Sequence, residues 1–73
     1  MMPLTMAGNG GTNTIVKITG KDASRRHLAE LGFVVGTDVT VTGQLGGNLI
    51  VAVRDARVAL DRELANRILV DLG

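Results

Sequence analysis

The sequence has 73 residues, 45% of them hydrophobic, and eight Lys and Arg against seven Asp and Glu give a formal net charge of +1. This length holds one domain with a modest core, and the absence of cysteine excludes a disulfide framework and a zinc site built on thiolates. The near-balance of charge gives no general attraction to nucleic acid or to an anionic membrane surface.

The first residues predict a lead into a single domain that spans residues 1–73. Within residues 1–13, three glycines at positions 8, 10 and 11 favour a flexible or partly ordered segment, while Leu4 and Met6, two positions apart, fit a short strand. No basic region precedes a long apolar segment, as it would in a secretory signal. The apolar run 49–53 is far shorter than the roughly 20 residues of a membrane-spanning helix. We therefore expect a cytoplasmic protein that does not insert into a membrane.

A strand and a helix follow. Residues 14–19 are rich in β-branched side chains and end at a glycine, which is typical of a strand. The apolar period then changes, and we expect a helix over residues 22–31 whose first amides are capped by Asp22. Gly32 fits the left-handed position that ends such a helix. One apolar stripe along this helix is formed by Leu28, Leu31 and either Ala23 or Ser24.

After residue 36 the apolar period returns to two, which predicts strands. The expected strands cover residues 37–43, 48–55, 57–60 and 67–70. Gly46–Gly47 is a hairpin signal between the first two, and a tight turn is expected near Asp55–Ala56. The strand over 48–55 has apolar residues on both faces, so we expect it to be central and buried on both sides. Asp61 is placed to cap a single helical turn before the last strand.

This order of elements predicts the fold class. Short strands with short connections and little helix usually close into a small barrel, and closure removes exposed sheet edges. We expect a mainly β, SH3-like barrel with one α-helix in the first connection and a short helical turn before the last strand.

The residue types that catalysis and metal binding need are scarce. The chain has a single histidine, His27, and its carboxylates are scattered, so neither a zinc site nor a calcium loop is predicted. Ser24 and His27 lie three apart but lack a third orienting group. The glycines near residues 8–11 and 20 complete no phosphate-binding motif. We expect no catalytic residue, no metal site and no cofactor.

The single aromatic residue, Phe33, limits the ligands that the barrel can bind. Proteins that bind single-stranded nucleic acid stack bases on aromatic side chains, and SH3 domains that bind proline-rich peptides use aromatic-lined grooves. Phe33 directly follows the predicted helix, where a core position is expected. The arginines at positions 25, 26, 54 and 57 are therefore expected to be solvated and not to form a nucleic-acid stripe.

Two blocks, RRHLAELGFVVGTDVTV at 25–41 and NLIVAVRDARVALDRELANRILV at 48–70, resemble the FeoA family, small accessory proteins of bacterial ferrous iron transport. The resemblance spans about residues 14–70. Val35 stands where the family usually has proline. The matching positions are Arg25, Leu28, Glu30, Leu31, Gly32, Phe33, Gly36, Val39, Arg57, Ala59, Leu60, Ile68 and Val70.

The resemblance implies an SH3-like barrel without metal ligands of its own and a cytoplasmic adaptor. Such an adaptor would associate with the membrane iron permease FeoB, near its G-protein domain, and support Fe(II) uptake. The residues that we expect at the contact surface are Arg25, Arg26, Leu28, Arg54 and Arg57, with the core as the competing place for Leu28. An exposed edge strand would also support a homo-oligomer, of unspecified stoichiometry.

Two alternatives stay open. The same domain is similar to the C-terminal module of diphtheria-toxin-repressor-type metalloregulators. Because the chain has no helix-turn-helix half, this alternative is a detached regulatory module and not a full repressor. The weaker alternative is a small nucleic-acid-binding barrel, against which the low net charge and the single aromatic residue argue.

Overall fold

The alternating apolar pattern of the chain forms one antiparallel sheet. The computed structural model describes residues 1–72. Its strands are β1 (Met2–Pro3), β2 (Thr12–Ile18), β3 (Asp38–Leu45), β4 (Asn48–Val53), β5 (Ala56–Asp61) and β6 (Ile68–Leu72). Its helices are the short 3-10 helix η1 (Leu4–Met6), α1 (Asp22–Glu30) and α2 (Arg62–Asn66). The mainly β architecture with one helix in the first connection and a helical turn before the last strand is confirmed.

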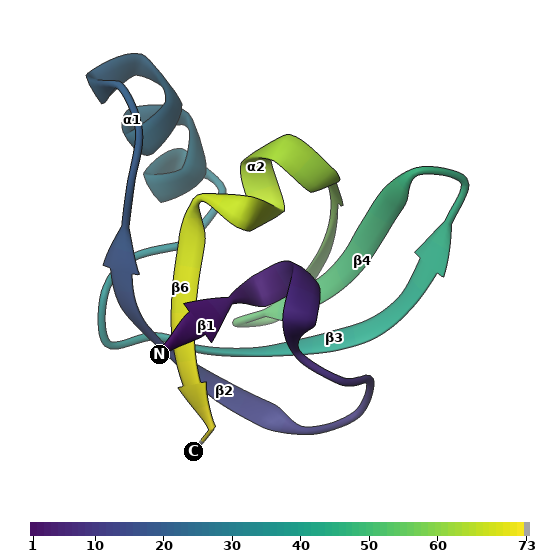
Figure 1. Cartoon of the computed structure of the whole chain (residues 1–73). Coiled ribbons are helices and arrows are strands. Elements are labelled where there is room, and N and C mark those ends of the chain that lie inside the picture. Colours follow the sequence, from purple (N-terminus) through teal and green to yellow (C-terminus); the bar gives the residue numbers. More distant parts are fainter. Residues whose placement is uncertain (73) are drawn as a thin grey trace.

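The six strands follow the order β1-β6-β2-β3-β4-β5, so the first and last strands of the chain are neighbours (Figure 1). The β3–β4 hairpin extends to one side of the molecule, and α1 lies at the other. The expectation that closure removes exposed edges is wrong, because β1 and β5 each have a single neighbour in the sheet.

One apolar core lies inside the curved sheet. Phe33, the largest of its side chains, is completely buried, as predicted, and its amide donates to the Leu28 carbonyl at 2.9 Å. This bond places the residue after α1 directly beneath the helix. The other buried apolar residues are Leu4, Ile15, Leu28, Val39, Val41, Leu49, Val51, Val53, Leu60, Ala65, Ile68 and Val70.

The N-terminal segment differs from the prediction. Met2 and Pro3 pair with β6, and Leu4–Met6 is a turn of 3-10 helix, so the strand predicted through Leu4 and Met6 is wrong. Leu4 is buried in the core whereas Met6 is 72% exposed. Two residues of one strand separated by two positions would share a face. The apolar spacing therefore resembled a strand, but the two side chains point in different directions.

The two helices begin differently. Asp61 caps α2 as predicted, since its Oδ1 accepts from the Leu64 amide at 2.8 Å. The predicted cap of α1 by Asp22 is wrong by one residue, because Lys21 holds the cap position and makes no capping bond with its side chain. Gly32, with φ of 105°, ends α1 in the left-handed region as predicted.

The two tight hairpins hold β3, β4 and β5 in register. Gly46–Gly47 forms the predicted β3–β4 turn. The β4–β5 turn lies at Arg54–Asp55, one residue earlier than predicted. The expected two-sided burial of β4 is wrong, because its core face is buried and its other face, which carries Ile50 and Ala52, is only half-buried.

Candidate functional site

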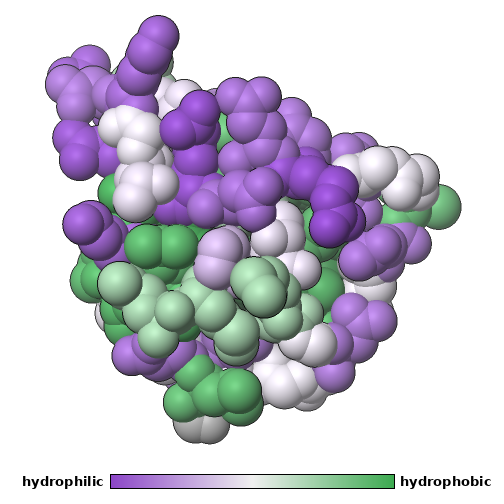
Figure 2. Space-filling model, viewed as in Figure 1, coloured by the Kyte–Doolittle hydropathy of each residue, from purple (hydrophilic) through white to green (hydrophobic). Residues whose placement is uncertain are grey.

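The exposed face of α1 is the first candidate surface. Arg25 and Arg26 each lie three or four residues from both Asp22 and Ala29, so the four residues share one side of the helix. They line a shallow, open depression of about 360 Å³. Hydrophilic residues dominate the part of the molecule where α1 and α2 lie, while apolar residues gather around the N-terminal segment (Figure 2).

Positive charge is concentrated in the first half of α1. Arg25 Nη2 donates to Asp22 Oδ1 at 2.6 Å, and both side chains are at least half exposed, so solvent screens this pair. Arg26 is exposed and forms no ion pair within residues 1–72. Lys21, at the helix cap, adds a second such cation. The face therefore offers guanidinium and ammonium groups to a partner, with only one of them already paired.

Arg54 and Arg57 form a second basic group. Both are exposed, Arg54 in the β4–β5 turn and Arg57 on β5. A Cβ built on Gly32 would lie 3.8 Å from Arg54 Cδ, so the stem of Arg54 lies beside the C-terminal end of α1. At 1.5 Å per residue, Arg25 and Gly32 are about 10 Å apart along the helix direction. The structure thus places Arg25 and Arg26 on α1, Arg54 beside its C-terminal end and Arg57 on β5.

Leu28 belongs to the core. Its side chain is completely buried, although it is only three residues from Arg25. In this conformation it packs against the interior and is not available to a partner. The candidate surface therefore consists of the arginines.

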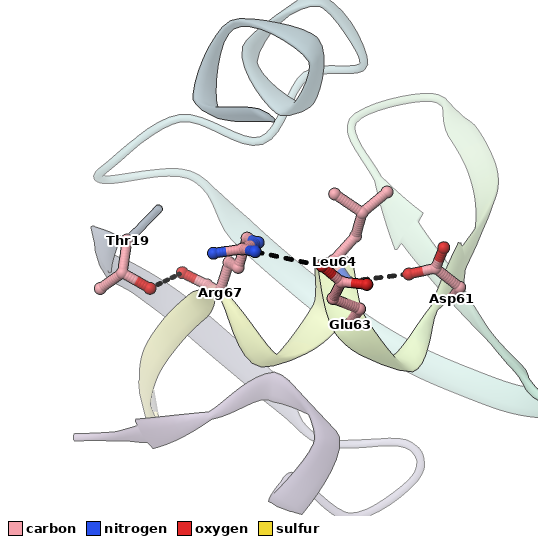
Figure 3. A network of polar contacts seen from close by, with 5 residues as sticks. All are labelled: Thr19, Asp61, Glu63, Leu64 and Arg67. Atoms are coloured by element: carbon pink, nitrogen blue, oxygen red, sulfur yellow. Dashed lines mark hydrogen bonds and ion pairs between the residues drawn. The ribbon is translucent and has the colours of Figure 1, made fainter. Parts of the chain in front are cut away.

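A polar network that sequence reasoning missed joins α2 to the segment before α1 (Figure 3). The Arg67 carbonyl accepts from the Thr19 amide at 2.8 Å and from Thr19 Oγ1 at 3.3 Å. The Arg67 guanidinium donates from Nη2 to Glu63 Oε1 at 3.2 Å. In the sequence, the spacing of four residues between Glu63 and Arg67 could have predicted this ion pair, because residues four apart are neighbours on a helix surface.

The Arg67 side chain also explains Gly20. Gly20 has φ of 108°, and a Cβ built there would lie 2.6 Å from Arg67 Nη1. Only glycine accommodates both the backbone conformation and the guanidinium. Arg67 Nε is buried without a hydrogen-bond partner among the described residues. This network therefore fixes the start of α1 relative to α2 and is structural.

Few groups suited to catalysis or metal binding are gathered together. Residues 1–72 contain no group of three or more His, Cys, Asp and Glu side chains that could hold a metal ion. His27 is exposed on α1, and Ser24 is half-buried one turn earlier. No helix in the described part of the chain is long and apolar enough to cross a membrane. The arrangement is suited to binding through its surface.

The fold of the chain matches that of solved SH3-like proteins. The chain is similar to Stenotrophomonas maltophilia FeoA in complex with zinc, described as a prokaryotic SH3 domain protein, with 31% identity and a TM-score of 0.84. The alignment covers 97% of this chain and 91% of that one, so the predicted SH3-like fold is confirmed. The sequence matches the FeoA domain over residues 2–72, and the chain belongs to the FeoA family.

Other solved structures extend the comparison. An iron uptake regulatory protein, also FeoA, is 30% identical with a TM-score of 0.87, over 96% of this chain and 93% of that one. A manganese-dependent transcriptional repressor in complex with manganese is 25% identical with a TM-score of 0.88, over 97% of this chain but only 36% of the repressor. No curated protein sequence gives a significant match.

Proposed function

We propose that this chain is a cytoplasmic, non-catalytic accessory protein of ferrous iron uptake, and that it binds the G-protein domain of a FeoB-type permease to support Fe(II) transport. The observation that carries the proposal is the match to the FeoA domain over residues 2–72. The Stenotrophomonas maltophilia relative is itself described as a candidate activating factor of bacterial ferrous iron transport. The absence of a metal-ligand cluster in residues 1–72 is compatible with action through the permease and not on the ion.

The contact surface in this proposal is the basic face of α1. Arg25 and Arg26 are exposed there, and Arg side chains are enriched at protein interfaces, where they pair with carboxylates. The partner surface would accordingly be acidic, and complementary charge would raise the association rate at low salt. Arg54, beside the C-terminal end of α1, and Arg57, on β5, supply a second contact.

A titration of the purified chain with the G-protein domain of the permease from the same cell tests this proposal. Binding should be saturable, and the double variant Arg25→Glu/Arg26→Glu should bind roughly tenfold or more weakly at low salt, because both cations become anions. Arg62→Glu is the matched control, since it reverses one exposed charge on α2 and should leave affinity within about twofold.

Each result of the titration has a meaning. Binding that the double variant retains would contradict the α1 surface while keeping the permease as partner. No binding in any nucleotide state, to the isolated domain or to the full-length permease, would contradict the proposed function.

The similarity to the manganese-dependent repressor supports a second candidate, a detached regulatory module that binds a metalloregulator. Because the chain spans little more than a third of that repressor, the likeness concerns one module of it. Binding to a purified repressor of the same cell that lacks its own SH3-like module, with none to the permease, would favour this candidate.

A further inference from the structure

β5 is an edge strand with a free outer side. It pairs along its whole length with β4 and has no second neighbour in the sheet. Within residues 1–72, no backbone hydrogen bond joins its outer side to a loop, and only its last residue, Asp61, takes part in a helix, as the cap of α2. An edge of this kind presents unpaired N–H and C=O groups that can accept another strand.

The register of the β4–β5 hairpin determines which backbone groups point outward. The two-residue turn Arg54–Asp55 leaves Val53 opposite Ala56, and the ends of such a turn are joined by a hydrogen bond. Hydrogen-bonded and non-hydrogen-bonded pairs alternate along an antiparallel ladder. Arg57, Ala59 and Asp61 therefore occupy the non-bonded pairs with β4, and their N–H groups face the open edge together with the C=O groups of Arg57 and Ala59. The Asp61 C=O, at the cap of α2, accepts the first bond of that helix.

The same three residues are exposed, and their side chains share one face of β5, because they alternate with the inward-facing Val58 and Leu60. Their charges are positive, neutral and negative in that order. When a two-fold axis places a second copy of β5 antiparallel to the first, the positive residue of each copy faces the negative residue of the other. Charged residues on an edge usually discourage pairing, but here opposite signs would face each other.

We propose that two copies of this chain associate through β5, paired antiparallel about a two-fold axis at Ala59. Ala59 then lies opposite Ala59 of the second copy, and each Arg57 lies opposite Asp61 of the other copy. The central pair exchanges two backbone hydrogen bonds, and each flanking pair forms one, from the Asp61 N–H to the Arg57 C=O of the other copy. Two ion pairs flank the axis.

The register with its axis at Ala59 is favoured over the registers with axes at Arg57 or Asp61, because it pairs opposite charges and allows more backbone hydrogen bonds. Only residues with outward backbone groups can form hydrogen-bonded pairs across the new interface. An axis at Arg57 would oppose two arginines, and an axis at Asp61 would oppose two carboxylates. The axis at Ala59 places the smallest side chain at the centre, and it uses all three outward residues.

The ionic groups are available for these contacts. Asp61 Oδ1 accepts from the Leu64 amide at 2.8 Å, which holds the carboxylate in place and leaves Oδ2 without a bond in the described structure. Arg57 has no ion pair within residues 1–72. A contact between two copies of one surface closes on itself, so association stops at two. The short strand gives a small interface, and the dimer will therefore depend on concentration.

Disulfide formation tests the register directly, because the natural chain contains no cysteine. In the proposed dimer the Cα atoms at position 59 are about 5.5 Å apart, within the range of a disulfide. Ala56→Cys is the matched control on the same strand, since the two copies of position 56 would be roughly 20 Å apart. Mild oxidation of Ala59→Cys should give a covalent dimer, and the control should stay monomeric. Equal cross-linking of both, or none of either, would overturn the proposal.

Sedimentation velocity of the purified chain tests the unmodified protein. The wild type should shift from monomer to dimer as concentration rises, and added salt should weaken the dimer. Ala59→Pro should abolish association, because proline removes the central outward N–H while leaving the bonds to β4. Circular dichroism checks that this variant folds. A wild type that stays monomeric at all concentrations, including one whose β5 pairs only with another protein, would overturn the proposal.

Arg57→Glu supplies a charge test that does not depend on proline. It puts two carboxylates opposite each other at both ends of the interface, so dimerisation should weaken roughly tenfold at low salt. Added salt should then strengthen its dimer, the reverse of the wild type. Lys17→Glu, with the same change of charge on exposed β2 surface, should behave as the wild type. An unchanged dimer in Arg57→Glu would contradict the proposed pairing. These tests use the chain alone, so their outcome is independent of binding to the permease.

Discussion

Arg54 is the only non-glycine residue with a positive φ, 53°, among residues 1–72. It is the first residue of the two-residue β4–β5 turn, a position where glycine or asparagine is usual because a Cβ is crowded. The Arg54 stem lies beside Gly32, and a cation near the end of α1 interacts favourably with the helix dipole. At the residue scale, an arginine therefore occupies a position that local backbone energetics assign to glycine.

Arg54→Gly should stabilise the protein. Removal of the strained Cβ should outweigh the flexibility that glycine adds to the unfolded chain, and the free energy of unfolding should rise by about 0.5–1 kcal/mol. Urea unfolding measures the change. Asp55→Gly, at the next residue of the turn with no positive φ, is the control and should not stabilise. A loss of stability in Arg54→Gly equal to that of the control would show that the arginine stem matters more than the backbone strain.

Gly20→Ala should destabilise the protein more than Gly36→Ala. Both glycines have positive φ, but only the Cβ at position 20 would clash, 2.6 Å from Arg67 Nη1, while nothing lies within 4 Å of the one at position 36. We expect an excess cost of about 1 kcal/mol at position 20. Because the clash is with a side chain, the excess should disappear when both substitutions are made in an Arg67→Ala background. An excess that persists there would assign the cost to the backbone alone.

At the scale of elements, the two helix starts show that a capping residue can be predicted correctly in type but misplaced by one position. Both Asp22 and Asp61 precede apolar helical patterns and suit a cap. The structure uses Asp61 in this way, but α1 begins at Asp22, whose carboxylate binds Arg25 instead. The sequence pattern predicts that a helix exists, but tertiary packing selects which residue begins it.

This difference predicts opposite effects of substitution at the two caps. Lys21 already has the extended conformation of a cap residue, with φ −73° and ψ 156°, so Lys21→Ser should stabilise the protein by about 0.5–1 kcal/mol. Asp61→Ala should destabilise it by about 1 kcal/mol, and Asp61→Asn, which keeps an acceptor, by much less. Thermal unfolding monitored by circular dichroism measures all three. Destabilisation by Lys21→Ser would show that the lysine stem contributes packing at this position.

The strands were predictable wherever one face is apolar, and Gly46–Gly47 identified its hairpin because few residues adopt that turn. The edges were not predictable from periodicity. Alternation in β5 indicates which face is buried but not how many neighbours the strand has. Local pattern equally could not show that Leu4 enters the core while Met6 is exposed, because that depends on the pairing of β1 with β6.

At the scale of the whole molecule, the sequence predicted which residues could form the candidate surface but not how they are placed relative to one another. The sequence identified four arginines, and the structure places two of them on α1, Arg54 beside its C-terminal end and Arg57 on β5. Leu28 shares the α1 sequence with the arginines but faces the core. The Arg67 network was missed because its partners, Thr19 and Gly20, are nearly fifty residues away in the chain.

Different parts of this small domain have different proposed roles. The core and the Arg67 network hold the fold, whereas the proposed permease contact lies on the basic face of α1 and the proposed contact between two copies lies on the β5 edge. Arg57 belongs both to the second basic group and to the β5 edge, but the α1 face and Ala59 are separate, so substitutions at those places remove one role without the other. Ala59→Pro should accordingly retain binding to the permease domain, which the same titration with that variant measures.

Ferrous iron uptake in cells that lack this chain tests the central proposal most directly. The wild-type chain should restore Fe(II) uptake, Arg62→Glu should restore it equally, and Arg25→Glu/Arg26→Glu, expressed and folded to the same level, should fail. Uptake that does not fall when the chain is removed would contradict the accessory role. Full uptake with the double variant would contradict the assignment of that role to the α1 surface.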